Sequence, residues 1–356
     1  MSVKTILLAG GYGLVGAMAA RALRAAHPDV TILIGGRNPD KAAVLVRELG
    51  NARAVKIDMT APAPLEDLNE EIDAVFCFVH DRDDRMLKDA MARGVAYGDI
   101  TRGMTEQLRA YVTAAAAPRA SAPVLFTSNW MAGVPSVLAM HMAEEFSQVT
   151  SIDLSILYYN ADKTGPDSGD AASSLAEPFA ARIGGQWVSV PSMSDGRTVT
   201  FPSGLTRNVY RMSMADAATL TQATGARDVA VRLGLDGKLA LSFMRVMLKL
   251  GLWPLVAKLN GQPGQVSGKG AAHEFVIKMA GKLKNGMSAQ KRLTLLDPKG
   301  QAHLTALGAL NGIEAMLGIG REPLRAGVAV PETAPDARRL LALLAAEGVK
   351  TEITPV

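Results

Sequence analysis

Three glycines near the start of the chain are spaced to hold a phosphate group. Gly11, Gly13 and Gly16 satisfy the pattern GxGxxG. They follow the apolar run Ile6–Ala9 and precede the Ala- and Leu-rich stretch Leu14–Ala26, so the loop joins a strand to a helix. In a β-α-β unit such glycines allow a tight turn, close approach of a pyrophosphate and close packing of the helix. We expect a dinucleotide whose pyrophosphate lies at the helix N-terminus, where free N–H groups favour an anion.

The end of the second strand indicates which dinucleotide is bound. Sites that prefer NAD usually place Asp or Glu there, about 20 residues after the last glycine, to bind the ribose 2′-hydroxyl. This chain instead has the sequence GGRN at 35–38. Arg37 can contact a 2′-phosphate and stack on adenine, with help from Asn38 and Lys41. The sequence therefore predicts NADP in preference to NAD, although a solvated arginine at a loop is the alternative.

The remaining cofactor contacts are expected after the third and fourth strands. Asp58 and Met59 are placed to meet the adenine, and Phe78 and Val79 to lie along the second ribose and the nicotinamide. The complete predicted cofactor site is Gly10, Gly11, Tyr12, Gly13, Leu14, Val15, Gly16, Arg37, Asn38, Lys41, Asp58, Met59, Phe78 and Val79.

Hydride transfer also requires a proton to move, so acid–base groups are expected at the ends of the later strands. His80 follows the fourth strand beside Asp81 and can exchange a proton near neutral pH, or it can be a surface histidine. Asp99 follows the fifth strand with Arg102, and it can equally cap the next turn. Asn129, with Trp130, follows the sixth strand. The candidate catalytic residues are therefore His80, Asp99 and Asn129.

Other reactive residues give weaker patterns. Arg182, Arg207 and Arg211 are possible carboxylate clamps or ordinary surface charges. His27, His141, His273 and His303 lack metal-ligand spacing, so no metal site is predicted.

A second enzyme class remains an alternative. Tyr159 and Lys163 match the YxxxK pair of short-chain dehydrogenases, and Gly10, Gly13 and Gly16 fit the GxxGxxG of that superfamily. That pair needs a helix, whereas Tyr159 ends an alternating strand pattern. A short-chain dehydrogenase or epimerase is thus one alternative, and a non-catalytic NADP-binding redox sensor is another.

The elements that must position these residues change in pattern at mid-chain. Strands and helices alternate up to residue 127, which is typical of a doubly wound parallel sheet, a Rossmann fold. From Ser151 to Tyr159 apolar and polar residues alternate, which indicates a mixed or antiparallel sheet with one open face. We predict an α/β protein with a dinucleotide-binding domain at 1–147 and 306–356, and an inserted α/β substrate or dimerisation domain at 148–305. The helix predicted at Glu332–Glu347 would return to the first domain.

Several motifs together resemble the saccharopine dehydrogenase-like family. They are GGYGLVG at 10–16, GGRNPDK at 35–41, Asp58, GVAYGDIT at 94–101, NWMAGVPSVLA at 129–139 and GVAVPE at 327–332. The resemblance implies a Rossmann domain, an inserted substrate domain and NAD(P)-linked oxidoreduction at the cleft between them. Some members act on imines formed from amino acids and keto or aldehyde partners. Other members are membrane-associated or use lipid-like substrates. It therefore implies hydride transfer to or from a small carbonyl or imine substrate.

Composition sets the remaining expectations. The chain has 356 residues, 48% hydrophobic and 20% charged, with a net charge of +4 that is spread along the sequence. No basic block suggests nucleic acid as a partner, and the single cysteine, Cys77, suits a reducing compartment. No signal peptide is recognised before the first strand, so we expect a cytoplasmic protein. We also expect a homodimer.

One nearly apolar segment, 239–259, contains Arg245, Lys249 and Pro254. It is interpreted as a helix in a dimer or domain interface, a cover over the substrate pocket, or a helix at a membrane surface.

Overall fold

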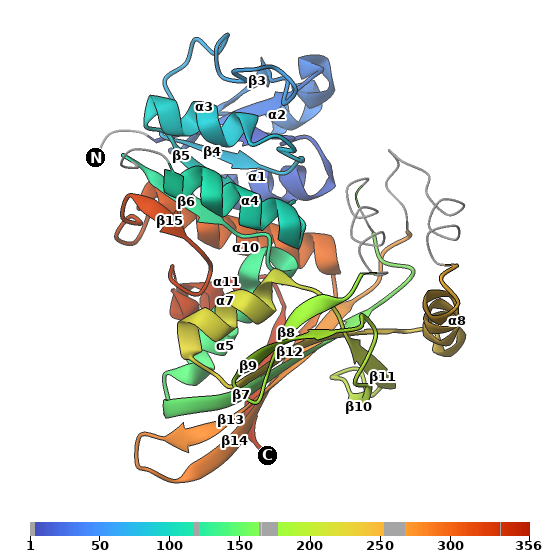
Figure 1. The fold of residues 1–356 in the computed structure, drawn as a ribbon. Coiled ribbons are helices and arrows are strands. Elements are labelled where there is room, and N and C mark those ends of the chain that lie inside the picture. Colours follow the sequence, from blue (N-terminus) through green and yellow to red (C-terminus); the bar gives the residue numbers. More distant parts are fainter. Residues whose placement is uncertain (1–3, 117–120, 164, 166–176, 253–267, 335) are drawn as a thin grey trace. The chain divides into compact units, whose positions relative to one another are not determined.

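The structure is a computed structural model that describes residues 4–116, 121–163, 165, 177–252, 268–334 and 336–356. The chain forms two compact units (Figure 1). The first unit comprises Met1–Gly133 and Thr305–Ala334, and the second unit comprises Val134–Leu304 and Pro335–Val356.

The first unit is built on a seven-stranded sheet with the order β15-β6-β5-β4-β1-β2-β3, in which all pairs are parallel. Its strands are β1 (Thr5–Ala9), β2 (Thr31–Gly36), β3 (Ala52–Lys56), β4 (Ala74–Cys77), β5 (Ala96–Asp99), β6 (Pro123–Phe126) and β15 (Gly327–Ala329). Its helices are α1 (Leu14–Ala26), η1 (Pro39–Ala42), α2 (Ala43–Leu49), α3 (Arg85–Arg93), α4 (Met104–Ala116), η2 (Trp130–Gly133) and most of α10 (Gln301–Leu317). This confirms the predicted doubly wound parallel sheet.

The central strands are apolar throughout because helices cover both of their faces. Ile6, Leu7 and Leu8 of β1 are completely buried, as are all four residues of β4. Helix α1 contacts α2, and α3 contacts α4 (Figure 1). The predicted helix at 14–26 and strands at 6–9 and 74–79 agree with α1, β1 and β4 to within two residues.

The second unit contains a nine-stranded mixed sheet, as predicted. Its strands are β7 (Phe146–Tyr158), β8 (Phe179–Ile183), β9 (Gln186–Val190), β10 (Arg197–Thr200), β11 (Thr206–Arg211), β12 (Asp228–Leu235), β13 (His273–Leu283), β14 (Ser288–Asp297) and β16 (Lys350–Pro355). Only β7 and β12 pair in parallel among these described strands. The helices described in this unit are α5 (Val134–Ala143), α7 (Ala215–Thr224), α8 (Lys238–Lys249) and α11 (Ala337–Ala346), together with the first residues of α10.

The alternation in β7 separates the two faces of this sheet. Ile152, Leu154 and Ile156 are buried on the face toward α5. Asp153, two residues on from Ser151, lies on the opposite, polar face, beside Lys278 of β13 and Ala230 of β12. The predicted open face is therefore a polar face that carries charged residues.

The end of the chain differs from the expected domain division. We predicted 306–356 in the first domain, but β16 pairs antiparallel with β14 and α11 contacts α5. Residues from 335 onward therefore belong to the second unit, as does α5, whereas 305–334 belong to the first. The pattern of leucines in α11 identified a helix, but it could not specify which sheet the helix covers.

The apolar segment 239–259 is described in part. Helix α8 buries Leu241 and Met244 and exposes Phe243, Val246 and Leu250, while residues 253–259 lie outside the described part of the chain. Among the described residues, the structure has no helix that is both long and apolar enough to span a membrane.

Candidate functional site

The glycine loop packs so tightly that side chains are excluded at most of its positions. Gly10 adopts a left-handed backbone conformation with φ of 77°, and a Cβ there would lie 2.5 Å from Val79 Cγ1. At Gly16 a Cβ would lie 2.5 Å from Gly10 O, so α1 contacts the loop closely. Gly13 differs, because its Cβ would meet only Gly10 O, at 3.1 Å. Gly13 therefore borders open space at the start of α1.

The N-terminus of α1 has the properties of an anion site. Gly13 is the N-cap residue and provides no side-chain cap, and the first turn contains no acidic residue. The first N–H groups of any α-helix lack partners within the helix, and the helix dipole makes this end positive. The space in front of Leu14 and Val15 is where the sequence predicts the pyrophosphate.

Tyr12 closes the other side of this loop. A Cβ on Gly36 would lie 2.3 Å from Tyr12 Cε1, so the ring packs directly on the end of β2. The Tyr12 hydroxyl is 3.5 Å from the backbone N of Asn38. The aromatic ring thereby connects the glycine loop to the segment that contains Arg37.

Arg37 is exposed and lies next to the end of β3, because Gly36 pairs with Lys56. Asp58 Oδ1 accepts hydrogen bonds from the hydroxyl and the backbone N–H of Thr60, at 2.7 and 2.9 Å. These bonds, and the positive charge of Arg37 nearby, lower the pKa of Asp58. Arg37 and Asp58 therefore lie close together, whereas Lys41 is exposed on η1.

The strands that carry the candidate catalytic residues end in one row. Ala9 pairs with Cys77, Cys77 with Asp99, and Asp99 with Phe126. The loops after β1, β4, β5 and β6 consequently leave the sheet at the same edge, where ligands bind in open parallel sheets. His80, Asp99 and Asn129 are brought to this edge, together with Phe78 and Val79 beside Gly10.

His80 follows β4 at this edge of the sheet. Its side chain is 10% exposed, and its Nδ1 is 3.7 Å from Glu106 Oε2. Glu106 was not predicted as a site residue. Its Oε2 also accepts a hydrogen bond from the backbone N–H of Gly103 at 3.1 Å, so it caps the start of α4. The histidine therefore faces a carboxylate held in place by the helix.

Asp99 belongs to a buried charged cluster, which we call the Arg102 cluster: Asp81, Asp84, Tyr97, Asp99 and Arg102. Arg102 Nε is 2.5 Å from Asp99 Oδ2, Nη2 is 3.2 Å from Asp81 Oδ2, and Nη1 pairs with Asp84. Tyr97 and Ser128 also donate hydrogen bonds to Asp99.

Burial raises the pKa of Asp99 even though Arg102 opposes this effect. Although burial disfavours the guanidinium charge, Asp99 and Tyr97 together raise the pKa of Arg102. Both Asp99 oxygens accept hydrogen bonds, from Tyr97 and Arg102 in the cluster and from Ser128 outside it, and its side chain is 1% exposed. These partners are side chains rather than backbone N–H groups, so the carboxyl holds the loops after β4, β5 and β6 together and does not cap the next turn, as the sequence had allowed.

Asn129 pairs with a residue that the sequence interpretation did not select. Its Nδ2 donates to Glu332 Oε1 at 3.2 Å, and both side chains are buried. Glu332 follows β15, so it reaches the same edge of the sheet. It stood within the GVAVPE motif, but nothing in the sequence indicated that its carboxyl meets Asn129.

The turn after Asn129 is strained. Met131 and Ala132 adopt left-handed conformations, with φ of 49° and 52°, and Gly133 follows with φ of 83°. Such conformations are costly for residues with side chains and cluster at functional sites. A Cβ on Gly308 would lie 2.4 Å from Met131 O, so α10 closely supports this turn. A strained turn therefore lies next to Asn129 at this edge of the sheet.

The Tyr159–Lys163 pair does not have the arrangement of a short-chain dehydrogenase. Tyr159 directly follows strand β7, and its hydroxyl donates to Glu274 Oε1 at 2.6 Å. Burial and the Glu274 carboxylate raise the pKa of Tyr159 to about 12, which is the opposite of activation by a neighbouring lysine.

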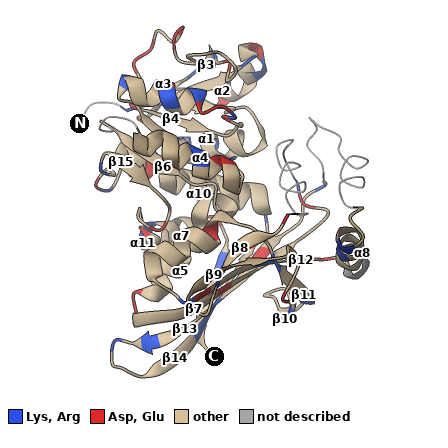
Figure 2. Cartoon of the chain, viewed as in Figure 1, with Lys and Arg blue, Asp and Glu red and all other residues tan. Residues whose placement is uncertain are grey.

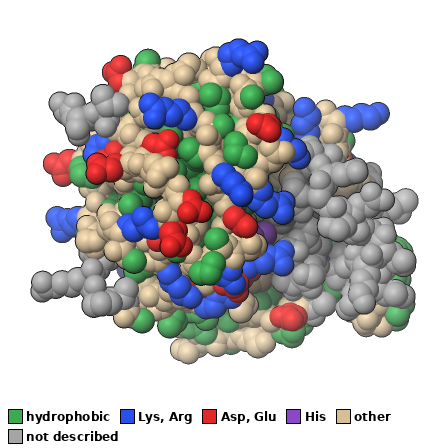
Figure 3. All heavy atoms as spheres, turned by 90° about the horizontal axis from the view of Figure 1, so that it is seen from above, with side chains coloured by type: hydrophobic (Ala, Val, Ile, Leu, Met, Phe, Trp, Pro, Cys, Tyr) green, Lys and Arg blue, Asp and Glu red, His purple; other side chains and the backbone are tan. Residues whose placement is uncertain are grey.

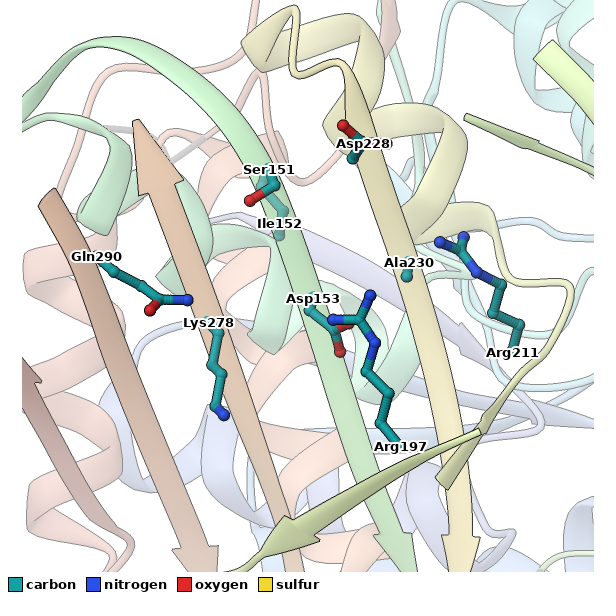
Figure 4. A pocket seen from close by; sticks show the side chains of 9 residues that line it. All are labelled: Ser151, Ile152, Asp153, Arg197, Arg211, Asp228, Ala230, Lys278 and Gln290. Atoms are coloured by element: carbon teal, nitrogen blue, oxygen red, sulfur yellow. The ribbon is translucent and has the colours of Figure 1, made fainter. Parts of the chain in front are cut away.

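The three arginines considered as carboxylate clamps have partners within the second unit. Arg211 Nε is 2.8 Å from Asp195 Oδ2, Arg207 Nε donates to Asp236 O, and Arg182 lies over the Trp187 ring. Arg211 also borders a hollow of about 230 Å³ on the polar sheet face (Figure 4). In this hollow Arg197 turns toward Asp153 and pairs with it at 3.0 Å (Figure 4).

Charges elsewhere are mixed. Basic and acidic residues both occur in each unit (Figure 2), and acidic and basic side chains lie among one another on the face in Figure 3. Within the described part of the chain, no group of three or more His, Cys, Asp or Glu residues could hold a metal ion.

Comparison with known proteins identifies the fold. No protein-family model and no curated protein matches the chain. Among solved structures, apo saccharopine dehydrogenase (L-Glu forming) from Saccharomyces cerevisiae is similar over 99% of this chain and 100% of its own, with a TM-score of 0.70 and 13% identity. A mutant meso-dapdh from Clostridium tetani E88 covers 92% and 93%, with a TM-score of 0.46 and 10% identity. An oxidoreductase from Sinorhizobium meliloti covers 99% of both chains, with a TM-score of 0.45 and 14% identity. The full-length similarity to the yeast structure confirms the fold that the motifs implied: this chain has the fold of saccharopine dehydrogenase.

Proposed function

We propose that this chain is an NADP-dependent oxidoreductase that transfers hydride to or from a small carbonyl or imine substrate. The observation that carries the proposal is the open space at Gly13, in front of an uncapped helix N-terminus and at the carboxyl edge of a parallel sheet. The fold of saccharopine dehydrogenase supports the same assignment.

The residues that would hold the cofactor are those of the predicted site. The N–H groups of Leu14 and Val15 would bind the pyrophosphate, and Arg37 the 2′-phosphate. Tyr12 and Asp58 border the position of Arg37, and Val79 supports Gly10. When bound, the nicotinamide supplies or accepts the hydride.

The proton is assigned to His80, whose ring lies beside Glu106 at the same edge. Asn129, held by Glu332, is assigned to hydrogen-bond the reacting oxygen or nitrogen of the substrate. Asp99 acts through the Arg102 cluster as a positioning residue, since its oxygens already accept three hydrogen bonds.

The cofactor assignment is tested by replacing Arg37 with glutamine. We expect NADPH to bind about tenfold to hundredfold more weakly, because a hydrogen bond to a charged group contributes about 1.5–3 kcal/mol. NADH affinity should be nearly unchanged, since NADH lacks the 2′-phosphate. Fluorescence titration with NADPH and with NADH measures the ratio of the two dissociation constants. Arg47→Gln, which removes an exposed arginine from α2, is the matched control. Tighter binding of NADH than NADPH to the native protein would overturn the NADP assignment.

The role of His80 is tested by His80→Gln on a substrate found by screening carbonyl and imine compounds. We expect kcat to fall at least about 100-fold, because general acid–base catalysis typically contributes that much, with NADPH affinity retained. His141→Gln in α5 is the control. An unchanged kcat/KM in His80→Gln would remove the role. NADPH binding without turnover of any compound would favour the redox-sensor alternative.

A further inference from the structure

The hairpin of β8 and β9 has an outer edge, along β9, with which no other described strand pairs. The strands are joined by Gly184 and Gly185, both left-handed with φ of 58° and 84°, as in the tightest hairpin turns. The backbone N–H of Gly184 donates to Asp228 Oδ1 at 2.7 Å and that of Gly185 to Arg227 O at 2.8 Å. The turn is therefore fixed to β12, whereas β9 pairs with β8 alone among the described strands.

The turn determines which backbone groups of β9 face this edge. In a two-residue hairpin the flanking residues, here Ile183 and Gln186, form a hydrogen-bonded pair, and the pattern then alternates. Val188, opposite Ala181, consequently directs its N–H and C=O toward β8. Trp187 and Ser189 direct theirs outward.

The other edge strands carry features that discourage pairing with another chain. Charged residues, prolines and short length all have this effect. The edge strands are β3 with Arg53 and Lys56, β16 with Lys350, Glu352 and Pro355, β10 with Arg197, and β15 with only three residues.

Strand β9 has none of these features. Its sequence is QWVSV, without charge or proline, and it spans five residues between Gly185 and Pro191. Trp187 is 49% exposed and Val188 39%, and Ile183 on β8 is 38% exposed. An uncharged, exposed edge of β-forming residues is suited to receive another strand.

We propose that β9 pairs with β9 of a second copy of this chain, antiparallel about a two-fold axis at Val188. In this register Trp187 and the second copy's Ser189 exchange two backbone hydrogen bonds, and the two-fold axis generates two more. This is the only register in which each of the five residues of β9 lies opposite a residue of the second copy's β9. The small side chain of Ser189 leaves room beside it for the partner's indole.

The charges are compatible with this pairing. Like charges opposite one another destabilise paired strands, and β9 brings none together. Arg182, the one charged residue of β8, lies over the Trp187 ring of its own hairpin. An identical strand is therefore a compatible partner, and the resulting contact closes as a symmetric dimer.

The test is Ser189→Pro, which removes one outward N–H and leaves the hydrogen bonds between β8 and β9 intact. Proline is tolerated at an outward position of an edge strand. Sedimentation velocity across a concentration series should show the native protein at twice its chain mass of 37.5 kDa and Ser189→Pro at that mass. Ser189→Ala, which keeps the N–H, is the control and should remain dimeric.

Val188→Lys provides a second test in case proline prevents folding, because it changes only a side chain. It places two lysines opposite each other at the two-fold axis and should also give monomers. NADPH affinity should be unchanged in both variants, so the outcome is independent of the proposed function. A native protein that is monomeric at all concentrations, or dimers that persist in both folded variants, would overturn the inference.

Discussion

Gly13→Val is expected to abolish measurable NADPH binding while the protein stays folded. The backbone at Gly13 is extended, with φ of −70°, so a valine is sterically allowed there. Its Cβ would approach Gly10 O at 3.1 Å, and its methyl groups are expected to occupy the space in front of α1. We expect the dissociation constant to rise at least about 100-fold, because the pyrophosphate can no longer approach the helix N-terminus. Isothermal titration calorimetry measures the affinity.

The cost in stability should be small, about 1 kcal/mol, which is typical when a favourable N-cap residue is replaced. Gly16→Val is the contrasting variant, since its Cβ would lie 2.5 Å from Gly10 O and 2.8 Å from Gly11 Cα. It should lose both stability and binding. If Gly13→Val bound NADPH with native affinity, the glycine loop would not be the nucleotide site.

Arg102→Met is expected to destabilise the protein by about 3–5 kcal/mol. Removing one partner of a buried ion pair leaves uncompensated charge. Here Asp81 and Asp99 lose their cation, and Asp84 keeps only the half-exposed Arg109. Urea denaturation measures the loss. Arg109→Met is the matched control, because Arg109 also pairs with Asp84 but is 47% exposed. It should cost less than about 1 kcal/mol.

The loss in Arg102→Met should also depend on pH. Burial already raises the pKa of Asp99 in the folded state above its unfolded value. Stability from such a carboxyl is present at low pH and declines as pH rises through the folded pKa. Without Arg102 the carboxylates hold protons more strongly, so the deficit relative to the native protein should be smaller at pH 5 than at pH 8. A deficit that is equal at both values would contradict this account of the cluster.

The sequence predicted the parallel sheet because its signals are local. Apolar strands, the glycine loop and the amphipathic α1 each depend on residues close together in the chain. The edge of the sheet that the loops after its strands share could also be predicted, because the carboxyl ends of neighbouring parallel strands lie at the same edge whatever the order of the strands. The residues after β4, β5 and β6 could thus be assigned to one site before the structure was known.

The remaining features depend on contacts between distant residues. Asn129 and Glu332 are 203 positions apart, so no local pattern shows that they meet. The return of β16 to the second sheet is similar, because an exposed strand of mixed polarity gives no indication of its partner. Tyr159 is likewise bound by Glu274, 115 positions further along the chain. Arg102 lies only three positions after Asp99, but its pairing with Asp81 and Asp84 joins it to the loop after β4.

A crystal structure of the native protein with NADPH would show whether the glycine loop binds the pyrophosphate of the nucleotide. We expect the pyrophosphate at the N–H groups of Leu14 and Val15, the 2′-phosphate at Arg37, and the nicotinamide beside His80 and Asn129. A nucleotide bound elsewhere, or a 2′-phosphate without contact to Arg37, would contradict this expectation.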